Sequence, residues 1–167
     1  MVVIIYGVSG AGKTTIGQLL ARQLGWHFIE ADDFHPEANI EKMRSGIPLT
    51  DEDRWPWLDR LREQIKRSLA ARENAVLACS ALKRAYRERL RVRREVTFVF
   101  LRGDYALIEE QLSQRRGHFM NPRLLRIQFA DLEEPTPDED VLTIQLGRTP
   151  RGLVEEIKRK LPFGGQN

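Results

Sequence analysis

The sequence predicts an α/β fold in which helices cover both faces of a five-stranded parallel sheet. Short apolar runs alternate with longer segments of helical period, which is the pattern of βαβ units. The 167 residues are 41% hydrophobic and 31% charged, close to ordinary globular usage and enough for one core. We therefore expect a single domain spanning residues 1–167.

Five apolar runs supply the expected strands, and each is followed by sequence of helical character. The runs are residues 2–6, 28–30, 75–79, 97–101 and 141–145. After the first run, apolar residues recur at helical spacing, and Gly25 is placed to end that helix. These recurring residues are Ile16, Leu19, Leu20 and Leu24.

Two segments interrupt the alternation, and a substrate would need both of them. Residues 32–73 form a long helical insertion punctuated by Pro36, Pro48 and Pro56. Residues 115–127 begin with a turn-like stretch and form a short lid. The sheet and its helices are then expected from residues 1–31, 74–114 and 128–162, with the insertion binding substrate.

Composition argues against a secreted or membrane protein. No apolar stretch approaches the ~20 residues that a membrane span needs, and the opening apolar run lacks the basic flank of a signal peptide. Cys79 is the only cysteine, which agrees with a reducing compartment. We expect a cytoplasmic protein without a membrane partner.

The net charge of +3 draws attention to residues 84–94, a helical-looking stretch with six arginines. One interpretation is a nucleic-acid surface. The other is a solvated helix face, with Glu88 and Glu95 interspersed and a few cations facing an anionic small molecule. The sequence has no aromatic RNA-binding motif, zinc-finger spacing or basic tail, so we expect no nucleic-acid partner.

A phosphate-binding loop follows the first predicted strand. Residues 7–14 match G-x-x-x-x-G-K-[ST] at every fixed position and open a predicted amphipathic helix. This context predicts the three-layer fold of P-loop NTPases, with ATP and Mg²⁺ as the expected cofactors. The expected nucleotide-binding residues are Gly7, Ser9, Gly10, Ala11, Gly12, Lys13, Thr14 and Thr15.

Two of these residues have a defined chemical role in phosphoryl transfer. Lys13 is expected to reach the β and γ phosphates and to act in catalysis. The Thr14 hydroxyl is expected to bind Mg²⁺. A glycine-rich turn that binds nothing is the alternative, and the strand and helix on either side argue against it.

Carboxylates stand where the second predicted strand ends, and ligands of open α/β sheets bind beyond such ends. Glu30 and Asp32 are two residues apart and would share one side of an extended chain. We expect Asp32 to orient or deprotonate an acceptor hydroxyl, and Glu30 to hold Mg²⁺ through water. The alternative is that Asp32 and Asp33 only cap the next helix.

Basic residues follow the third predicted strand and the lid turn. Lys83 and Arg87, near a helix start, could receive a small anion such as a carboxylate, although such cations are usually solvated. Arg115, Arg116 and Arg123 flank the lid turn, and Arg115 on a closing flap would stabilise the transferring charge. A surface arginine in a loop is the alternative. His35 and His118 lie in the two substrate segments and could bind hydroxyls.

Beyond the phosphate loop, five blocks of the chain resemble the gluconokinase family, a branch of the shikimate-kinase-like P-loop kinases. The blocks are DDFHP at 32–36, NIEKM at 39–43, GIPLTDEDR at 46–54, CSALK at 79–83 and GHFM at 117–120. The resemblance covers nearly the whole chain. It implies ATP-dependent phosphorylation of D-gluconate to 6-phosphogluconate, Mg²⁺ dependence, a closing lid and a homodimer.

Carried onto matching positions, the resemblance supports Gly10 to Thr14 and Asp32, and it adds gluconate contacts. The candidate substrate contacts are Asp32, His35, Arg54, Ser80, Lys83, Arg87 and His118. Two positions depart from the family pattern. Ile127 stands where a serine or threonine usually precedes Gln128-Phe129, so a hydroxyl contact is missing there, and Ala11 replaces a frequent serine.

Other functions remain open from the sequence. A kinase of the same fold could act on shikimate, a nucleotide or another small metabolite. A non-catalytic ATP-binding switch would bind ATP tightly without acceptor-dependent turnover. An ATPase that binds nucleic acid through the arginine-rich segment would show salt-sensitive binding and stimulated hydrolysis.

Overall fold

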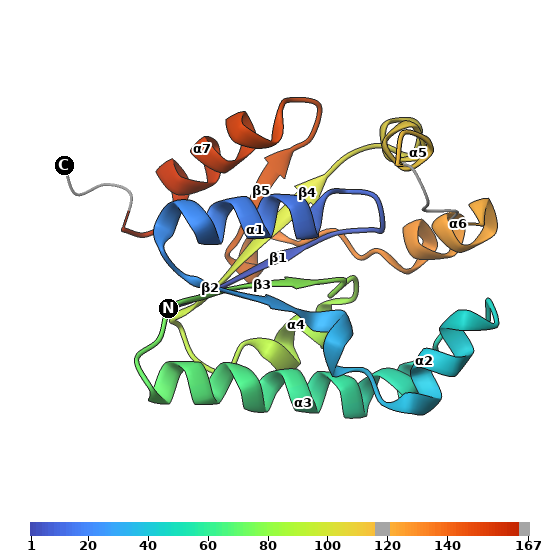
Figure 1. The fold of residues 1–167 in the computed structure, drawn as a ribbon, viewed down its shortest axis with the longest axis horizontal. Coiled ribbons are helices and arrows are strands. Elements are labelled where there is room, and N and C mark those ends of the chain that lie inside the picture. Colours follow the sequence, from blue (N-terminus) through green and yellow to red (C-terminus); the bar gives the residue numbers. More distant parts are fainter. Residues whose placement is uncertain (116–120, 164–167) are drawn as a thin grey trace.

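The computed structural model describes residues 1–115 and 121–163 and contains one five-stranded parallel sheet (Figure 1). Its strand order is β2-β3-β1-β4-β5. The strands are β1 (Val2–Tyr6), β2 (His27–Glu30), β3 (Ala75–Cys79), β4 (Val96–Arg102) and β5 (Val141–Gln145). The five predicted strands are therefore confirmed in number and direction, and those at 2–6, 75–79 and 141–145 have the predicted bounds.

Helices lie on both faces of the sheet and make three layers (Figure 1). One face carries α1 (Lys13–Leu24) and α7 (Pro150–Lys160), and the other carries α3 (Asp51–Ala70) and α4 (Arg84–Leu90). Gly25 ends α1 in the left-handed conformation at φ 68°, as the sequence predicts. The predicted three-layer α/β fold is confirmed.

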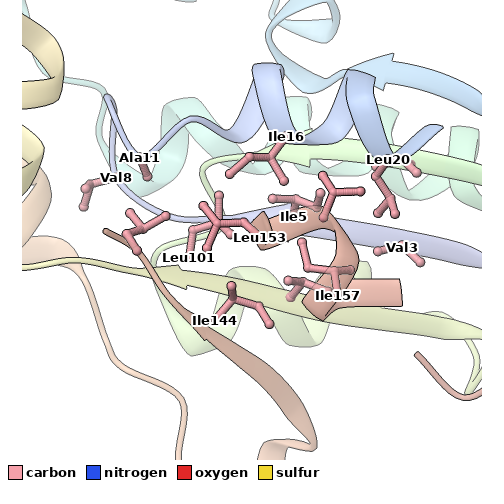
Figure 2. Close-up of a cluster of buried hydrophobic side chains, with 14 of the residues drawn as sticks. Val3, Ile5, Val8, Ala11, Ile16, Leu20, Leu101, Ile144, Leu153 and Ile157 are labelled. Atoms are coloured by element: carbon pink, nitrogen blue, oxygen red, sulfur yellow. The ribbon is translucent and has the colours of Figure 1, made fainter. Parts of the chain in front are cut away.

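Two apolar cores flank the sheet because neighbouring residues of a strand point to opposite faces. Val3 and Ile5 of β1 pack with α1 and α7 on one face (Figure 2), while Val2, Ile4 and Tyr6 pack under α3 and α4. All five side chains are fully buried. The uninterrupted apolar character of this strand is typical of a parallel sheet covered on both faces.

Three helices and a short 3₁₀ turn gather at the carboxyl ends of the strands (Figure 1). They are η1 (Ala31–Phe34), α2 (Glu37–Arg44), α5 (Tyr105–Ser113) and α6 (Pro122–Asp131). A second 3₁₀ turn, η2 (Pro137–Glu139), precedes β5. In the part of the chain that the structure describes, no helix is long and apolar enough to cross a membrane.

Two boundary predictions are wrong for local reasons. Pro56 does not punctuate the insertion, because it lies inside the 20-residue helix α3. The Thr50–Asp53 capping box and the buried apolar face of α3 outweigh the one backbone hydrogen bond that proline removes. The arginine-rich stretch is not helical throughout, since α4 ends at Leu90 and the chain then turns into β4.

Candidate active site

A cleft of about 600 Å³ opens at the carboxyl ends of the strands. The phosphate loop, η1, the insertion, the end of β3 and the α5–α6 region all contribute to its walls. The predicted site residues among its lining are Ser9, Gly10, Gly12, Lys13, Thr14, Glu30, Asp32, His35, Arg54, Ser80 and Arg115. The structure therefore brings together residues from five separate segments of the sequence.

The phosphate loop adopts a conformation that its glycines make possible. Gly10 and Gly12 have φ values of 83° and 93°, where a side chain would be strained. The loop leads directly into α1, whose first-turn N–H groups favour an anion. Lys13 Nζ donates hydrogen bonds to the carbonyls of Gly7, at 2.9 Å, and Val8, at 3.0 Å. Burial lowers the pKa of Lys13, and the nearby Asp32 carboxylate opposes that shift.

Oxygen ligands for a hard cation lie beside the loop. Thr14 Oγ1 donates to the Glu30 carboxylate at 2.6 Å. Burial raises the pKa of Glu30, and the hydrogen bond from Thr14 opposes this. Among the described residues, no group of three or more His, Cys, Asp or Glu side chains could hold a metal ion. A pair of oxygens fits Mg²⁺, which is commonly held by few protein ligands together with substrate phosphates.

Asp32 lines the cleft, but it lies in a different element from the one expected. Strand β2 ends at Glu30, and Asp32 lies in the 3₁₀ turn η1, so the two residues do not share one extended segment. Both carboxylates nevertheless line the cleft. The Asp32 side chain is 72% exposed, and its Oδ1 lies 3.7 Å from His35 Nε2.

His35 is held firmly on the insertion side of the cleft. Its ring stacks on Trp57 with a centroid distance of 4.4 Å and an interplanar angle of 12°. Asn39 Nδ2 lies 3.2 Å from His35 Nδ1 and also donates to the Asp53 carbonyl at 2.9 Å. Trp57 Nε1 in turn donates to the Ala31 carbonyl at 2.7 Å, which ties α3 to the turn that carries Asp32.

Arg54, which belongs to α3 of the insertion, contacts α4 and α6. Its Nη1 donates to the Tyr86 hydroxyl at 3.1 Å, and its Nη2 lies 3.9 Å from Asp131 Oδ2. Lys83 donates to Asp51 at 3.0 Å, and the Tyr86 hydroxyl bonds the same carboxylate. Arg54 lines the cleft, whereas Lys83 does not.

Gln128 of α6 is a contact that the site prediction missed. The Ser9 amide donates to Gln128 Oε1 at 2.6 Å, and Gln128 Nε2 donates to Ser9 Oγ at 3.0 Å. Asp131, one helical turn later, pairs with Arg54. Helix α6 therefore contacts the phosphate loop and the insertion from one face. The Gln128-Phe129 pair was visible as a family feature, but its partner 119 residues away was not.

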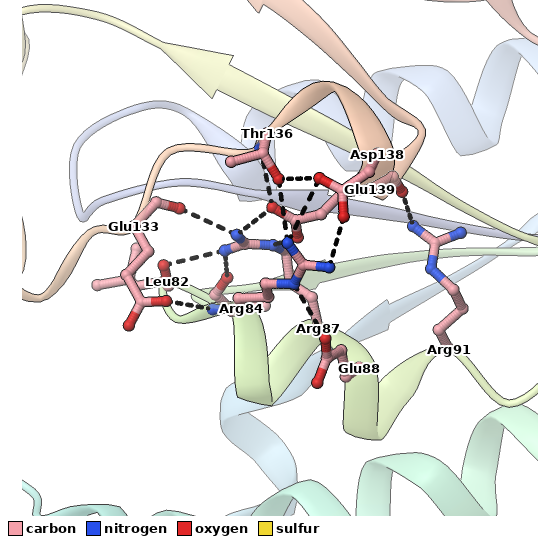
Figure 3. Close-up of polar contacts among 10 residues, drawn as sticks. Leu82, Arg84, Arg87, Glu88, Arg91, Glu133, Thr136, Asp138 and Glu139 are labelled. Atoms are coloured by element: carbon pink, nitrogen blue, oxygen red, sulfur yellow. Dashed lines mark hydrogen bonds and ion pairs between the residues drawn. The ribbon is translucent and has the colours of Figure 1, made fainter.

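The prediction that Arg87 binds substrate is wrong, because its guanidinium is buried and fully engaged (Figure 3). Nε and Nη2 donate to the two Glu139 oxygens at 2.8 and 3.0 Å. The remaining donors bind the carbonyls of Ala81, Leu82 and Glu133. The solvated helix face expected around it is also only partly correct, since Arg91 donates to the Glu139 carbonyl at 2.7 Å.

Some predicted residues lie elsewhere. Gly7 and Ala11 belong to the loop but are buried, and Thr15 is exposed on α1. None of these three lines the cleft. Arg116 and His118 lie outside the described residues. Ile127, the position that departs from the family pattern, does line the cleft with its apolar side chain.

Comparison with known proteins places this geometry in a family context. The shikimate kinase family model matches residues 9–158. A gluconokinase of Gluconobacter oxydans is 48% identical over 161 residues, covering 93% of this chain and 88% of that protein. The thermosensitive gluconokinase of Escherichia coli is 43% identical over 166 residues, covering 98% and 89%.

Solved structures agree with the sequence comparison. A gluconokinase from Sinorhizobium meliloti has a TM-score of 0.84 at 42% identity, covering 92% of this chain and 87% of that one. A shikimate kinase from Acinetobacter baumannii, solved with shikimate, has a TM-score of 0.61 at 23% identity and covers 99% and 95%. The second likeness concerns the fold alone.

Proposed function

The chain belongs to the gluconokinase family of shikimate-kinase-like P-loop kinases, and from that premise we propose how its cleft phosphorylates D-gluconate with ATP. One observation carries the proposal. The phosphate loop, with Lys13 and Thr14, and the carboxylate of Asp32 line the same cleft. A nucleotide's terminal phosphate and an acceptor alcohol can therefore meet in one place.

Different residues of the cleft bind the phosphate donor and the acceptor alcohol. The loop amides, the start of α1 and Lys13 bind the β and γ phosphates of ATP. Thr14 and, through water, Glu30 would hold Mg²⁺, which would supply positive charge to neutralise the phosphates. Arg115 lines the cleft from the end of α5 and offers a further cation to the transferring group.

Asp32 acts on the 6-hydroxyl of gluconate. It orients this oxygen in line with the γ phosphorus and accepts its proton as the new P–O bond forms and the bond to the β–γ bridging oxygen breaks. The products are 6-phosphogluconate and ADP. The acceptor side of the cleft is lined by His35, Arg54 and Ser80. Lys83 would join them if its ammonium group left the Asp51 carboxylate and bound the substrate. His118 keeps its expected substrate role but lies outside the described residues.

An ADP-release assay over a panel of acceptors tests this function. We expect turnover that requires both Mg²⁺ and gluconate, with little release for shikimate or nucleoside monophosphates. Turnover with one of those acceptors alone would assign the cleft to a different kinase. Tight ATP binding with no turnover on any acceptor would identify a binding switch instead.

We also propose a cytoplasmic homodimer. The assembly rests on the family resemblance, and the compartment agrees with the lone buried thiol of Cys79. Sedimentation equilibrium is expected to give twice the 19.4 kDa mass of one chain. A monomer at micromolar concentration would remove the dimer from the proposal.

The contact of Gln128 with the phosphate loop leads to a first prediction. We expect Gln128→Leu to raise the KM for ATP about 10-fold, because two hydrogen bonds of roughly 0.5–1.5 kcal/mol each no longer order the loop. Initial rates at saturating gluconate measure this. Adding Ser9→Ala to the variant should change little more, since both substitutions act on one contact. A lowered KM would mean that Gln128 competes with the nucleotide.

A further inference from the structure

The buried imidazole of His35 has a polar side chain beside each of its ring nitrogens. On one side stands Asn39, which is 3% exposed, and on the other stands the exposed Asp32 carboxylate. We propose that His35 is a positioning residue, which directs an N–H at Asp32 to aim this carboxylate at the acceptor hydroxyl, and that Asn39 sets its tautomer. The inference rests on the proposed function and assigns His35 a role other than direct gluconate binding.

Asn39 fixes which ring nitrogen carries the proton. Its Nδ2 donates to the Asp53 carbonyl at 2.9 Å, and a carbonyl can only accept, so the amide group faces this way. The second N–H of the same amide is then directed at His35 Nδ1, at 3.2 Å. Because Nδ1 accepts this hydrogen bond, a neutral His35 carries its proton on Nε2.

Packing fixes the direction in which that proton points. The ring stacks on Trp57, and the His35 side chain is only 4% exposed, so it has no room to rotate toward solvent. Nε2 faces Asp32 Oδ1 at 3.7 Å, which is longer than a hydrogen bond. A small rotation of the exposed Asp32 side chain closes this gap, as catalytic hydrogen bonds often tighten only when substrate binds.

The electrostatics agree with a neutral donor. Burial lowers the pKa of His35, the Asp32 carboxylate opposes that shift, and the Arg54 guanidinium adds to it. A neutral imidazole can donate one hydrogen bond without neutralising the carboxylate. Asp32 therefore keeps its capacity to accept the proton of the acceptor hydroxyl.

Two substitutions of His35 separate positioning from packing. Glutamine can place an N–H near the position of Nε2, whereas the shorter asparagine reaches only the position of Nδ1. We expect His35→Asn to lower kcat about 30-fold with the gluconate KM within 3-fold, because a misdirected catalytic group costs turnover and not binding. His35→Gln should stay within about 5-fold of wild-type kcat. Thermal unfolding of both variants controls for lost packing.

Measuring His35→Asn in an Asp32→Asn variant tests the role of His35 separately from the proposed function. If His35 acts through Asp32, adding His35→Asn to Asp32→Asn lowers kcat no further. A full additional loss, or a gluconate KM raised 10-fold or more by His35→Asn alone, would overturn the inference and make His35 a direct substrate contact. Failure of wild-type protein to phosphorylate gluconate would instead overturn the proposed function.

The tautomer can be observed directly. ¹⁵N shifts of the imidazoles, assigned with His35→Gln, should show His35 with its proton on Nε2 in the full-length protein. Asn39→Asp puts a carboxylate opposite Nδ1 and should move a proton onto that nitrogen. A wild-type spectrum with the proton on Nδ1 would contradict the proposed direction of the donor.

Discussion

Replacing Asp32 by asparagine is expected to lower kcat about 1,000-fold while the dissociation constant for ATP changes less than about 3-fold. A positioned general base contributes roughly 10²–10⁴-fold, and asparagine keeps the shape of the side chain but cannot take a proton. Asp32 belongs to η1 and not to the loop that binds the nucleotide, so we expect its replacement to change ATP affinity little. Single-turnover rates and calorimetric ATP titration measure the two quantities.

Asp33 supplies the matched control. It is the adjacent exposed carboxylate in η1 and does not line the cleft. Asp33→Asn should therefore leave kcat within about 2-fold of wild type, since surface substitutions away from a site change little. If both variants kept wild-type turnover, Asp32 would have no part in the chemistry.

The fold was predictable because its signals are local. Each strand is a short apolar run, and the phosphate loop marks the junction between β1 and α1 within eight residues of sequence. The strand ends were less certain where pairing extends beyond the apolar run. His27 pairs with Ala75, and Arg102 pairs with Gln145, so β2 and β4 include polar residues that no hydrophobic pattern indicates.

The site was predictable where chain position alone decides it. Residues that follow β1, β2 and β3 meet at one edge of a parallel sheet, and this placed Lys13, Asp32 and Ser80 in the cleft. Contacts that depend on distant partners were not predictable. Gln128 meets Ser9 across 119 residues, and Asn39 meets Asp53 only because α2 packs beside the start of α3.

Arg87 is the clearest example of a residue whose role could not be predicted from the sequence. Six arginines lie within residues 84–94, and nothing in their immediate sequence distinguishes the buried one from its solvated neighbours. The distinction is made by Glu139, which comes 52 residues later. A tertiary partner turned a predicted anion receptor into an internal ion pair with side chains only 2% and 6% exposed.

Removing Arg87 is therefore expected to affect stability more than substrate binding. Arg87→Met leaves Glu139 buried without its partner and frees the carbonyls of Ala81 and Leu82 (Figure 3). Breaking a buried pair from one side costs about 3–5 kcal/mol of unfolding free energy. For a domain of this size that is a fall in Tm of roughly 10 °C. Urea unfolding followed by circular dichroism measures the loss.

Two control variants test whether the loss of stability comes from the buried Arg87–Glu139 pair. Arg84→Met removes a neighbouring arginine whose partners, Glu88 and Asp138, are exposed, so its unfolding midpoint should stay near that of wild type. Arg87→Met combined with Glu139→Gln should lose less than Arg87→Met alone, because no charge is left buried. An Arg87→Met protein as stable as the Arg84→Met protein would show that the pair contributes nothing.

The pH dependence of the same pair has a definite sign. Burial acts to raise the pKa of Glu139, but hydrogen bonds from Arg87 and the Thr136 amide outweigh it, so the pKa lies below its ordinary value. A carboxyl whose pKa is lowered on folding stabilises the protein above its unfolded pKa of about 4.3, and that stabilisation is lost as the pH falls through the folded value. The stability gap between wild type and the double variant should therefore be constant from pH 6 to 8 and narrow below about pH 4. A gap that stayed unchanged in acid would mean that Arg87 stabilises the fold through its carbonyl contacts and not through the Glu139 charge.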